Sequence, residues 1–384
     1  MDIAAELEHL LSEPFEAARD RGRRRWDATW TPGTPLVLHG AGNVGVRTLR
    51  HLRSQGIEPA AFADFSTARQ GTSLEGLPVL SPAQAVTQWG ASGLILVTII
   101  NRTHSYAATA NAYARLGSVR TAPVLEYFWA HPEDCLPYYA MSAPETVLEG
   151  REEILQAFAA LTDPASRTHL FGYIRWRLHL DYTALPGPCD ELEYFPGGLV
   201  AFKGPQCYVD CGAYDGDTLR QFLAQAGDGF QEAHLFEPDP ANFQKLAARI
   251  RELPRAMADK VTIHPMAAGA GPGLLRFQSD GAESSALSAT GNSEVPVAAL
   301  DDLLAGIAPT FLKMDIEGAE LEALRGASGL IRRHRPTLAI CVYHRPDHPW
   351  KIPLFLKQLL PDHRIAIRPH AADGWEWVAY AVPA

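Results

Sequence analysis

The stretch Tyr208-Val-Asp-Cys-Gly-Ala-Tyr-Asp-Gly-Asp-Thr218, followed by His234-Leu-Phe-Glu-Pro-Asp239, decides the fold. Each piece begins as an apolar strand and ends in an acid, Asp210 in the first and Glu237 in the second. A glycine turn follows the first acid and leads into a helix. Open α/β sheets bind ligands at the carboxyl ends of their strands, where the strand order reverses. We therefore expect both acids at one sheet edge, with Glu237 placed to bind the hydroxyls of a ribose.

The charge of the glycine turn indicates which of two kinds of nucleoside ligand could bind there. A pyrophosphate binds a bare helix N-terminus, whereas Asp215 and Asp217 make this turn acidic. The third glycine of a dinucleotide fingerprint is also missing. The turn therefore favours a ligand with a cationic end, such as the sulfonium and amino group of S-adenosylmethionine. The alternative is an ordinary strand-to-helix turn in which Asp217 or Thr218 caps the helix.

The composition is that of a globular protein with two or three domains. The chain has 384 residues, of which 47% are hydrophobic and 20% are charged. The formal net charge of -10 argues against nucleic-acid and anionic-membrane partners. Five scattered cysteines without metal-site spacing favour a reducing compartment. Since we find neither a signal peptide nor an apolar run of membrane-spanning length, we expect a cytoplasmic protein.

Hydrophobic patterning divides the chain into four segments: a helical preamble (1–30), a strand–helix alternation (31–127), a helical connector (128–200) and a second alternation (201–384). Such alternation predicts two Rossmann-like α/β domains with mainly parallel sheets. In the second domain we expect strands at 207–211, 233–237, 261–266, 311–315, 338–343, 363–367 and 376–382. The last two are predicted to form a hairpin, so the last strand runs antiparallel. That is the architecture of class I methyltransferases.

A second chemical signal is Lys313-Met-Asp-Ile-Glu-Gly-Ala-Glu320. Strand alternation places Lys313 and Asp315 on one face, with Asp315 at the strand end and Glu317 in the loop beyond it. His344 ends the next strand, where an imidazole of near-neutral pKa can take a hydroxyl proton. The alternatives are a structural histidine and, for Glu320, a carboxylate in the first turn of a helix. We interpret three later histidines as surface or packing residues: His348, His363 and His370.

Taken together, the segments resemble those of the FkbM methyltransferases over roughly residues 190–384. The resemblance rests on four motifs in order: Val209-Asp-Cys-Gly-Ala-Tyr-Asp-Gly216, Phe236-Glu-Pro238, Lys313 to Glu320 and Val342-Tyr-His344. It implies methyl transfer from S-adenosylmethionine, usually to a hydroxyl oxygen of a carbohydrate or secondary metabolite. It leaves the acceptor unnamed.

The resemblance also implies roles for individual residues. The expected donor contacts are Asp210, Gly212, Ala213 and Gly216 at the methionine end, Glu237 at the ribose, Pro238, Asp239 and Ala267 at the adenine, and Ser284 and Ser285 nearby. The expected catalytic set is Asp315, His344, Glu317 and Lys313. One alternative is a Mg²⁺ ion held by Asp315, Glu317 and Asp280, which would lower the pKa of the acceptor.

The amino-terminal alternation carries its own fingerprint. Gly40-Ala-Gly42-Asn-Val-Gly45 is a complete GxGxxG between a strand and a helix, and Asp64 ends the next strand. With Gly76-Leu-Pro-Val-Leu-Ser-Pro82, this region resembles the small Rossmann domains that precede sugar acyltransferases, which implies a nucleotide or nucleotide-sugar ligand. The alternative is a fold kept for packing or for a homodimer. Two rival functions remain: an NAD-dependent sugar-modifying enzyme that uses this fingerprint, and a non-catalytic binding module.

Overall fold

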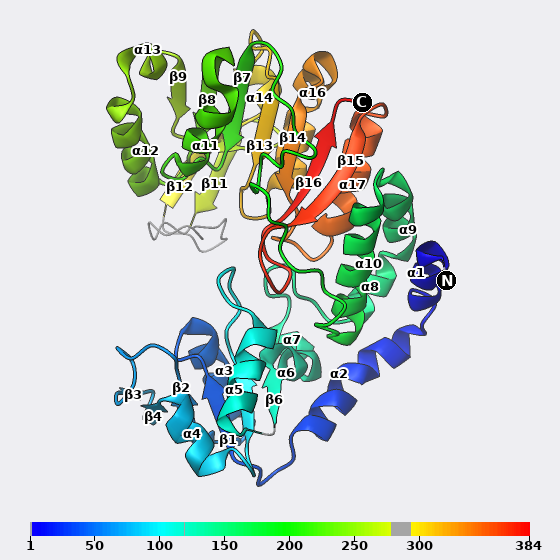
Figure 1. Cartoon of the computed structure of the whole chain (residues 1–384), viewed down its shortest axis with the longest axis vertical. Helices are drawn as coiled ribbons and strands as arrows, with labels where there is room; N and C mark the ends of the chain where they lie inside the picture. Colours follow the sequence, from blue (N-terminus) through cyan, green and yellow to red (C-terminus); the bar gives the residue numbers. More distant parts are fainter. Residues whose placement is uncertain (1, 119, 278–292) are drawn as a thin grey trace. The chain divides into compact units, whose positions relative to one another are not determined.

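A computed structural model of the chain describes residues 2–118, 120–277 and 293–384 (Figure 1). The chain forms two compact α/β units. Unit 1 comprises Met1–Arg151, Phe171–Pro186 and Ala371–Trp375, and unit 2 comprises Glu152–Leu170, Gly187–His370 and Glu376–Ala384. The predicted connector, 128–200, is therefore divided between the two units instead of forming a part of its own. Helical patterning cannot reveal this division, because it reports which face of a helix is buried and not against which unit.

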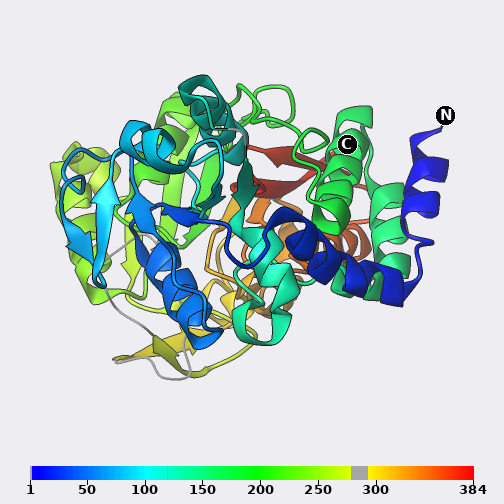
Figure 2. The same cartoon turned by 90° about the horizontal axis from the view of Figure 1, so that it is seen from below.

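Unit 1 contains a six-stranded sheet in the order β3-β4-β2-β1-β5-β6. The strands are β1 (Leu36–His39), β2 (Ala61–Ala63), β3 (Ser73–Leu74), β4 (Leu77–Leu80), β5 (Leu94–Val97) and β6 (Thr121–Pro123). Every pairing in this sheet is parallel except that of β3 with β4. In Figure 2 most of this unit is drawn in blue to cyan. The strand–helix alternation predicted for this region is thus present, with helices between parallel strands.

The helices of the amino-terminal part are α1 (Ile3–Leu10), α2 (Phe15–Thr29), α3 (Asn43–Ser54), α4 (Pro82–Trp89), α5 (Tyr106–Leu116), α6 (Val124–Ala130), α7 (Pro132–Cys135) and α8 (Glu145–Glu149). The helix α3 follows the glycine turn directly. A Cβ atom on Gly45 would lie 2.1 Å from the carbonyl oxygen of Gly40, so only glycine lets this helix pack against the end of β1. Close helix–strand packing is the role of the third glycine in a GxGxxG turn.

Unit 2 contains a seven-stranded sheet in the order β15-β16-β14-β13-β7-β8-β9. Its strands are β7 (Gln206–Cys211), β8 (Phe230–Phe236), β9 (Val261–His264), β13 (Phe311–Met314), β14 (Thr337–Cys341), β15 (Arg364–Pro369) and β16 (Trp377–Val382). The last strand, β16, runs antiparallel to both of its neighbours, as predicted. A small sheet of β10 (Ala267–Ala268), β12 (Ser293–Ala298) and β11 (Gly273–Phe277) was not expected.

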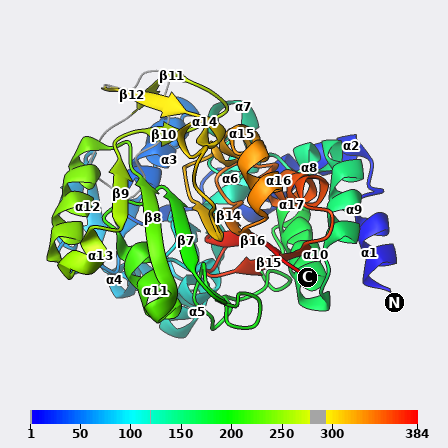
Figure 3. The ribbon, with the colours of Figure 1, turned by 90° about the horizontal axis from the view of Figure 1, so that it is seen from above.

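Connections between the strands of unit 2 run in two directions from its centre. From β7 the chain passes through α11 (Asp217–Ala226) to β8, and through α12 (Pro240–Glu252) and α13 (Arg255–Ala258) to β9. From β13 it passes the other way, through α15 (Glu320–Gly326) and α16 (Ser328–His334) to β14. Right-handed crossovers therefore place the two groups of helices on opposite faces (Figure 3). The strand order reverses between β7 and β13, which is where an open α/β sheet binds its ligand.

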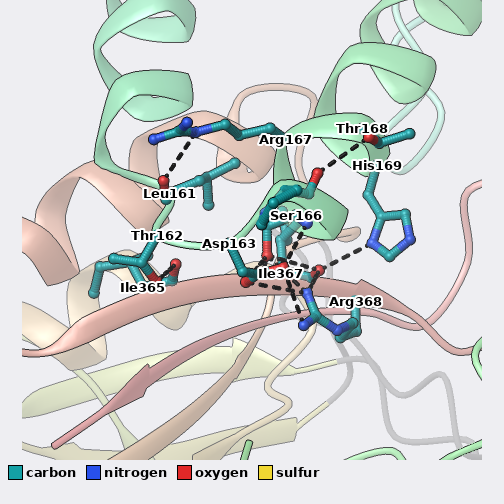
Figure 4. A network of polar contacts seen from close by, with 11 residues as sticks. Leu161, Thr162, Asp163, Ser166, Arg167, Thr168, His169, Ile365, Ile367 and Arg368 are labelled. Carbon is teal, nitrogen blue, oxygen red and sulfur yellow. Dashed lines mark hydrogen bonds and ion pairs between the residues drawn. The ribbon is translucent and has the colours of Figure 1, made fainter. Parts of the chain in front are cut away.

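The remaining helices of unit 2 are α9 (Arg151–Ala160), the start of α10 (Pro164–His179), α14 (Leu300–Leu303), α17 (His348–Leu359) and the 3₁₀ turn Gly227–Gly229. The start of α10 is bound to the edge strand β15 (Figure 4). Ser166 Oγ accepts the N–H of Ile367 at 3.0 Å, and Arg368 forms an ion pair with Asp163 at 3.2 Å. These contacts cover part of an edge that would otherwise expose backbone groups.

None of the helices within the described ranges combines the length and the apolar character that a membrane crossing requires.

Candidate functional site

Four neighbouring strands of unit 2 bring their carboxyl ends to the point where the strand order reverses. Asp210 lies in β7, Glu237 follows β8, Asp315 follows β13, and His344 lies three residues beyond β14. The strands are neighbours in the order β14-β13-β7-β8. The structure therefore brings the acids and the histidine that were predicted from separate motifs to one edge of one sheet.

Asp210 and Lys313 form a buried ion pair across β7 and β13, where they are register partners. Lys313 Nζ lies 3.0 Å from Asp210 Oδ1 and donates to the carbonyl of Gly212 at 2.7 Å, and the Tyr208 hydroxyl donates to Asp210 Oδ2 at 2.9 Å. Burial raises the pKa of Asp210 to about 6 against the opposing effect of Lys313. The side chains of Asp210 and Lys313 are 0% and 3% exposed, so their ion pair joins two strands inside the unit. Their predicted roles, in donor binding and in catalysis, stay predictions.

The first glycine of the turn serves packing within the sheet edge. Gly212 has a φ of +85°, and a Cβ atom there would lie 1.8 Å from the carbonyl oxygen of Asp315. Glycine is therefore required here by the close approach of two strand ends, and the contact of Gly212 with a donor stays a prediction. Gly216, at φ +87°, starts α11 without a side-chain cap.

We expect Gly212→Ala to lower the free energy of unfolding by roughly 2–4 kcal/mol, because it combines an unfavourable φ with overpacking. Urea unfolding followed by circular dichroism measures the loss. Gly197→Ala is the matched control, because no atom lies within 4 Å of its added Cβ and its φ is not positive. A loss for Gly212→Ala no larger than that of the control would contradict this account of the turn.

The acidity of the turn is partly balanced within the protein. Asp215 receives two hydrogen bonds from Arg249, at 3.1 and 2.7 Å. The partner of Asp215 lies on α12, too far along the sequence to be recognised from local patterning. Asp217 occupies the first turn of α11, where a carboxylate is favourable.

Glu237 is held by the backbone on both sides. Its Oε2 accepts the N–H of Tyr214, in the glycine turn, and its Oε1 accepts the N–H of Asp239, each at 2.8 Å. Glu237 is 5% exposed, and burial raises its pKa to about 7. Asp239 is fully buried and its Oδ1 accepts the N–H groups of Ala241 and Asn242, so it caps α12, and its place beside an adenine stays a prediction.

The other predicted donor contacts lie at several positions in unit 2. Ala213 is buried, whereas Pro238 and Ala267 are half-buried, the latter in β10. Ser284, Ser285 and the proposed magnesium ligand Asp280 lie outside the described residues. The contacts of these residues with a donor therefore stay predictions.

Three carboxylates surround the buried imidazole of His344. Its Nδ1 lies 2.7 Å from Glu320 Oε1, and its Nε2 lies 3.4 Å from Asp315 Oδ1 and 3.7 Å from Glu317 Oε2. Glu320 Oε1 also accepts the N–H groups of Ile316 and Gly318, so the carboxylate is fixed by its own loop. Glu317 adopts a φ of +55°, a conformation that non-glycine residues adopt mainly where the surroundings demand it.

The charges of this cluster are strongly coupled. Burial lowers the pKa of His344, but the Glu320 carboxylate outweighs burial and the pKa reaches about 10. Burial raises the pKa of Glu320, yet His344 reverses this and holds it well below its usual range. Burial raises the pKa of Glu317 to about 7. The carboxylates around His344 thus favour its protonated form, and its action as a base stays a prediction.

Two residues that contact this site were not among the predicted site residues. Tyr194, from the predicted connector, donates from its hydroxyl to Asp315 Oδ2 at 2.9 Å, and its ring lies 5.1 Å below Lys313 Nζ. His348, interpreted as a surface or packing residue, is buried with Nδ1 3.2 Å from Glu320 Oε2. No motif signals either residue, because each reaches the cluster only through the tertiary fold.

The amino-terminal fingerprint places Asp64 under its glycine turn. The carboxylate accepts the N–H of Ala41 at 2.9 Å and of Ser66 at 2.8 Å, and it pairs with Arg69 at 3.0 Å. In each unit an acid that follows a strand contacts the glycine turn: Asp64 in unit 1 and Glu237 in unit 2. Asp64 also forms an ion pair with Arg69. Nucleotide binding by Gly40, Gly42, Gly45 and Asp64 stays a prediction, which an NADH fluorescence titration would test.

Comparisons with known proteins agree with this geometry. Residues 210–365 match the model of the methyltransferase FkbM domain. The crystal structure of methyltransferase FkbM from Methylobacillus flagellatus KT is similar at 25% identity and a TM-score of 0.76, covering 96% of this chain and 98% of that one. A putative rRNA methylase from Clostridium thermocellum aligns at 10% identity and a TM-score of 0.33, over 48% of this chain and 88% of that one. UDP-D-quinovosamine 4-dehydrogenase from Vibrio fischeri aligns at 20% identity and a TM-score of 0.19, over 23% of this chain and 78% of that one.

The last two similarities are too low to bear on function, and no curated protein matches the chain. The family match contains the acidic strand ends and the histidine cluster, and the similarity to the crystal structure extends over nearly the whole chain. Residues 210–365 of the seven-stranded unit are therefore similar to the methyltransferase domain of the FkbM family.

Proposed function

We propose that unit 2 transfers a methyl group from S-adenosylmethionine to a hydroxyl of a sugar or secondary metabolite. The observation that carries the proposal is the position of Glu237, whose two oxygens are held by amides of the glycine turn and of the following helix start. On the other side of the reversal point, Asp315 and Glu317 face the ring of His344. The end of β8 thus suits a nucleoside, and the end of β13, on the other side of β7, offers groups for an acceptor.

The residues present fit this donor better than a dinucleotide. Each oxygen of Glu237 accepts one amide hydrogen and keeps acceptor capacity for a ribose hydroxyl. The start of α11 carries Asp217, which disfavours a phosphate there. Lys313, the cation at the end of β13, is already paired with Asp210. These features support a ligand that carries positive charge.

The chemistry required of the chain is alignment and proton acceptance. The donor supplies a methyl group already activated by its sulfonium. The residues of the site hold the acceptor oxygen in line with that group, which is where most of the rate enhancement originates. The carboxylates of Asp315 and Glu317 accept a hydrogen bond from the acceptor hydroxyl and receive its proton, and Tyr194 holds Asp315 in place through Oδ2.

The choice of acceptor follows from the same groups. Carboxylates that accept hydrogen bonds suit a molecule with several hydroxyls, such as a sugar.

All five cysteines are free thiols, which supports the predicted cytoplasmic location.

Titration calorimetry with S-adenosylhomocysteine tests the donor site. We expect the wild type to bind and Glu237→Gln to bind about 10–100-fold more weakly, because hydrogen bonds to a charged group contribute roughly 1.5–3 kcal/mol. Glu232→Gln, the same change at a half-buried position earlier on β8, is expected to leave the affinity within about twofold. Absence of binding by the wild type would overturn the proposed donor. Equal binding by Glu237→Gln would show that Glu237 does not contribute to donor binding.

A further inference from the structure

One ring nitrogen of His344 lacks a partner. Nε2 is buried and makes no hydrogen bond with the residues that the structure describes, and the side chain is 2% exposed. Buried polar atoms are almost always hydrogen-bonded, so an exception calls for a reason. The ring cannot turn to satisfy Nε2 without losing the contact of Nδ1 with Glu320, which two backbone amides hold in place. Nε2 is therefore aimed at a fixed point.

Two carboxylate oxygens surround the same point. Asp315 Oδ1 lies 3.4 Å from Nε2, and Glu317 Oε2 lies 3.7 Å from it. Both separations exceed the usual hydrogen-bond distance. They are close to the separation of two atoms bound to one tetrahedral metal ion, which is roughly 3.4 Å for bonds of about 2.1 Å. Ligand atoms of Asp315 and His344 also lie within 4.8 Å of each other and of Glu320, the carboxylate that contacts Nδ1, so Asp315 and His344 are close enough to share one ion.

We propose that Asp315, Glu317 and His344 bind a divalent transition-metal ion through Oδ1, Oε2 and Nε2. An imidazole with two carboxylates suits ions such as Mn²⁺, Fe²⁺, Co²⁺ and Zn²⁺, whereas Mg²⁺ prefers ligand sets made of oxygen alone. Three protein ligands leave coordination positions for water or another oxygen, as catalytic metal sites do.

The outer contacts of the three ligands match what a metal site requires. Metal-binding histidines usually direct their other nitrogen to a carboxylate, which is the position of Glu320 on Nδ1. Tyr194 donates to Oδ2 of Asp315 and so leaves Oδ1 for the ion. The protein thus fixes one atom of His344 and one atom of Asp315. The backbone conformation of Glu317 places that residue over the cluster.

The role of the ion rests on the proposed methyl transfer. An acceptor hydroxyl bound at an open position would have a lowered pKa and a fixed place beside the donor. Its proton would pass to the carboxylate oxygen of Glu317 that does not bind the ion, as the methyl group forms its bond to the acceptor oxygen and leaves the sulfur.

Cobalt is the probe for this site, because its visible absorption reports coordination without any assay of activity. The full chain is stripped with EDTA, dialysed and titrated with Co²⁺, and the stoichiometry is checked by elemental analysis. We expect one equivalent of Co²⁺ with a visible band, displaced by Zn²⁺ but not by a hundredfold excess of Mg²⁺. Asp315→Asn and His344→Gln are each expected to weaken binding at least tenfold.

The control is Glu322→Gln, which removes an exposed acid two residues beyond Glu320 and is expected to leave the affinity within twofold. Circular dichroism confirms folding, and the asparagine at 315 still accepts the hydrogen bond of Tyr194. No uptake of Co²⁺, Mn²⁺ or Zn²⁺ by the wild type overturns the inference, as does undiminished uptake by both variants. Donor binding without metal uptake rejects the metal site alone, whereas metal uptake without donor binding rejects the proposed function alone.

Discussion

Lys313→Met is expected to lower the free energy of unfolding by about 3–5 kcal/mol, the usual cost of leaving one member of a buried ion pair without its partner. Lys313 is buried with Asp210, and removal of its ammonium would leave that carboxylate with the Tyr208 hydroxyl alone. The carbonyl of Gly212 would also lose its donor. Urea unfolding monitored by circular dichroism and by tryptophan fluorescence measures the change.

The double variant Asp210→Asn with Lys313→Met distinguishes the contribution of charge pairing to the free energy of unfolding from that of side-chain packing. It removes both charges, so we expect it to recover at least about 2 kcal/mol of the loss caused by Lys313→Met. If the two single losses simply add in the double variant, the pair makes no coupled contribution and our account of β7 and β13 is wrong. If Lys313→Met unfolds like the wild type but loses activity, the sequence-based catalytic role of Lys313 is favoured instead.

Asp315→Asn is expected to reduce the rate of methyl transfer by roughly 10²–10⁴-fold, the range that a positioned acid or base contributes. The asparagine keeps the size of the side chain and the bond from Tyr194, but loses the negative charge that faces His344 and the acceptor. The rate is measured as S-adenosylhomocysteine release with a panel of methyl pyranosides. Calorimetry on the same variant is expected to show a donor affinity within about threefold of the wild type, because the charge lies on the acceptor side of the site.

Glu322→Gln again serves as the control, since Glu322 is exposed and pairs with Arg325 on the helix surface. It is expected to retain the wild-type rate. A rate for Asp315→Asn within threefold of that control would show that the carboxylate does not act on the acceptor.

Several features of the site could be predicted because they depend on periodicity along the chain. Strands end where apolar runs end, and parallel strands bring their carboxyl ends to one edge. Glu237, Asp315 and His344 therefore lie at neighbouring strand ends, as expected from their motifs. The terminal hairpin was predictable for the same reason, because its two apolar runs are separated by a short turn.

The partner of each side chain could not be predicted in this way. Asp210 and Lys313 both looked available for a ligand, yet the register of β7 against β13 makes them partners of each other. Asp215 is balanced by Arg249 from a helix that follows another strand. The pKa of His344 depends on Glu320, which local patterning assigned to the first turn of a helix.

By itself the sequence determined the α/β class, the seven strands with their antiparallel end and the edge where the acids gather, since all of these follow from local periodicity and chain connectivity. Only the tertiary structure decided which charges neutralise each other, which carboxylates remain for a ligand and that Tyr194 and His348 join the cluster. The physical reason is that electrostatic pairing and burial depend on distances of a few ångströms between segments that are far apart in the chain, and no repeat in the sequence encodes those distances.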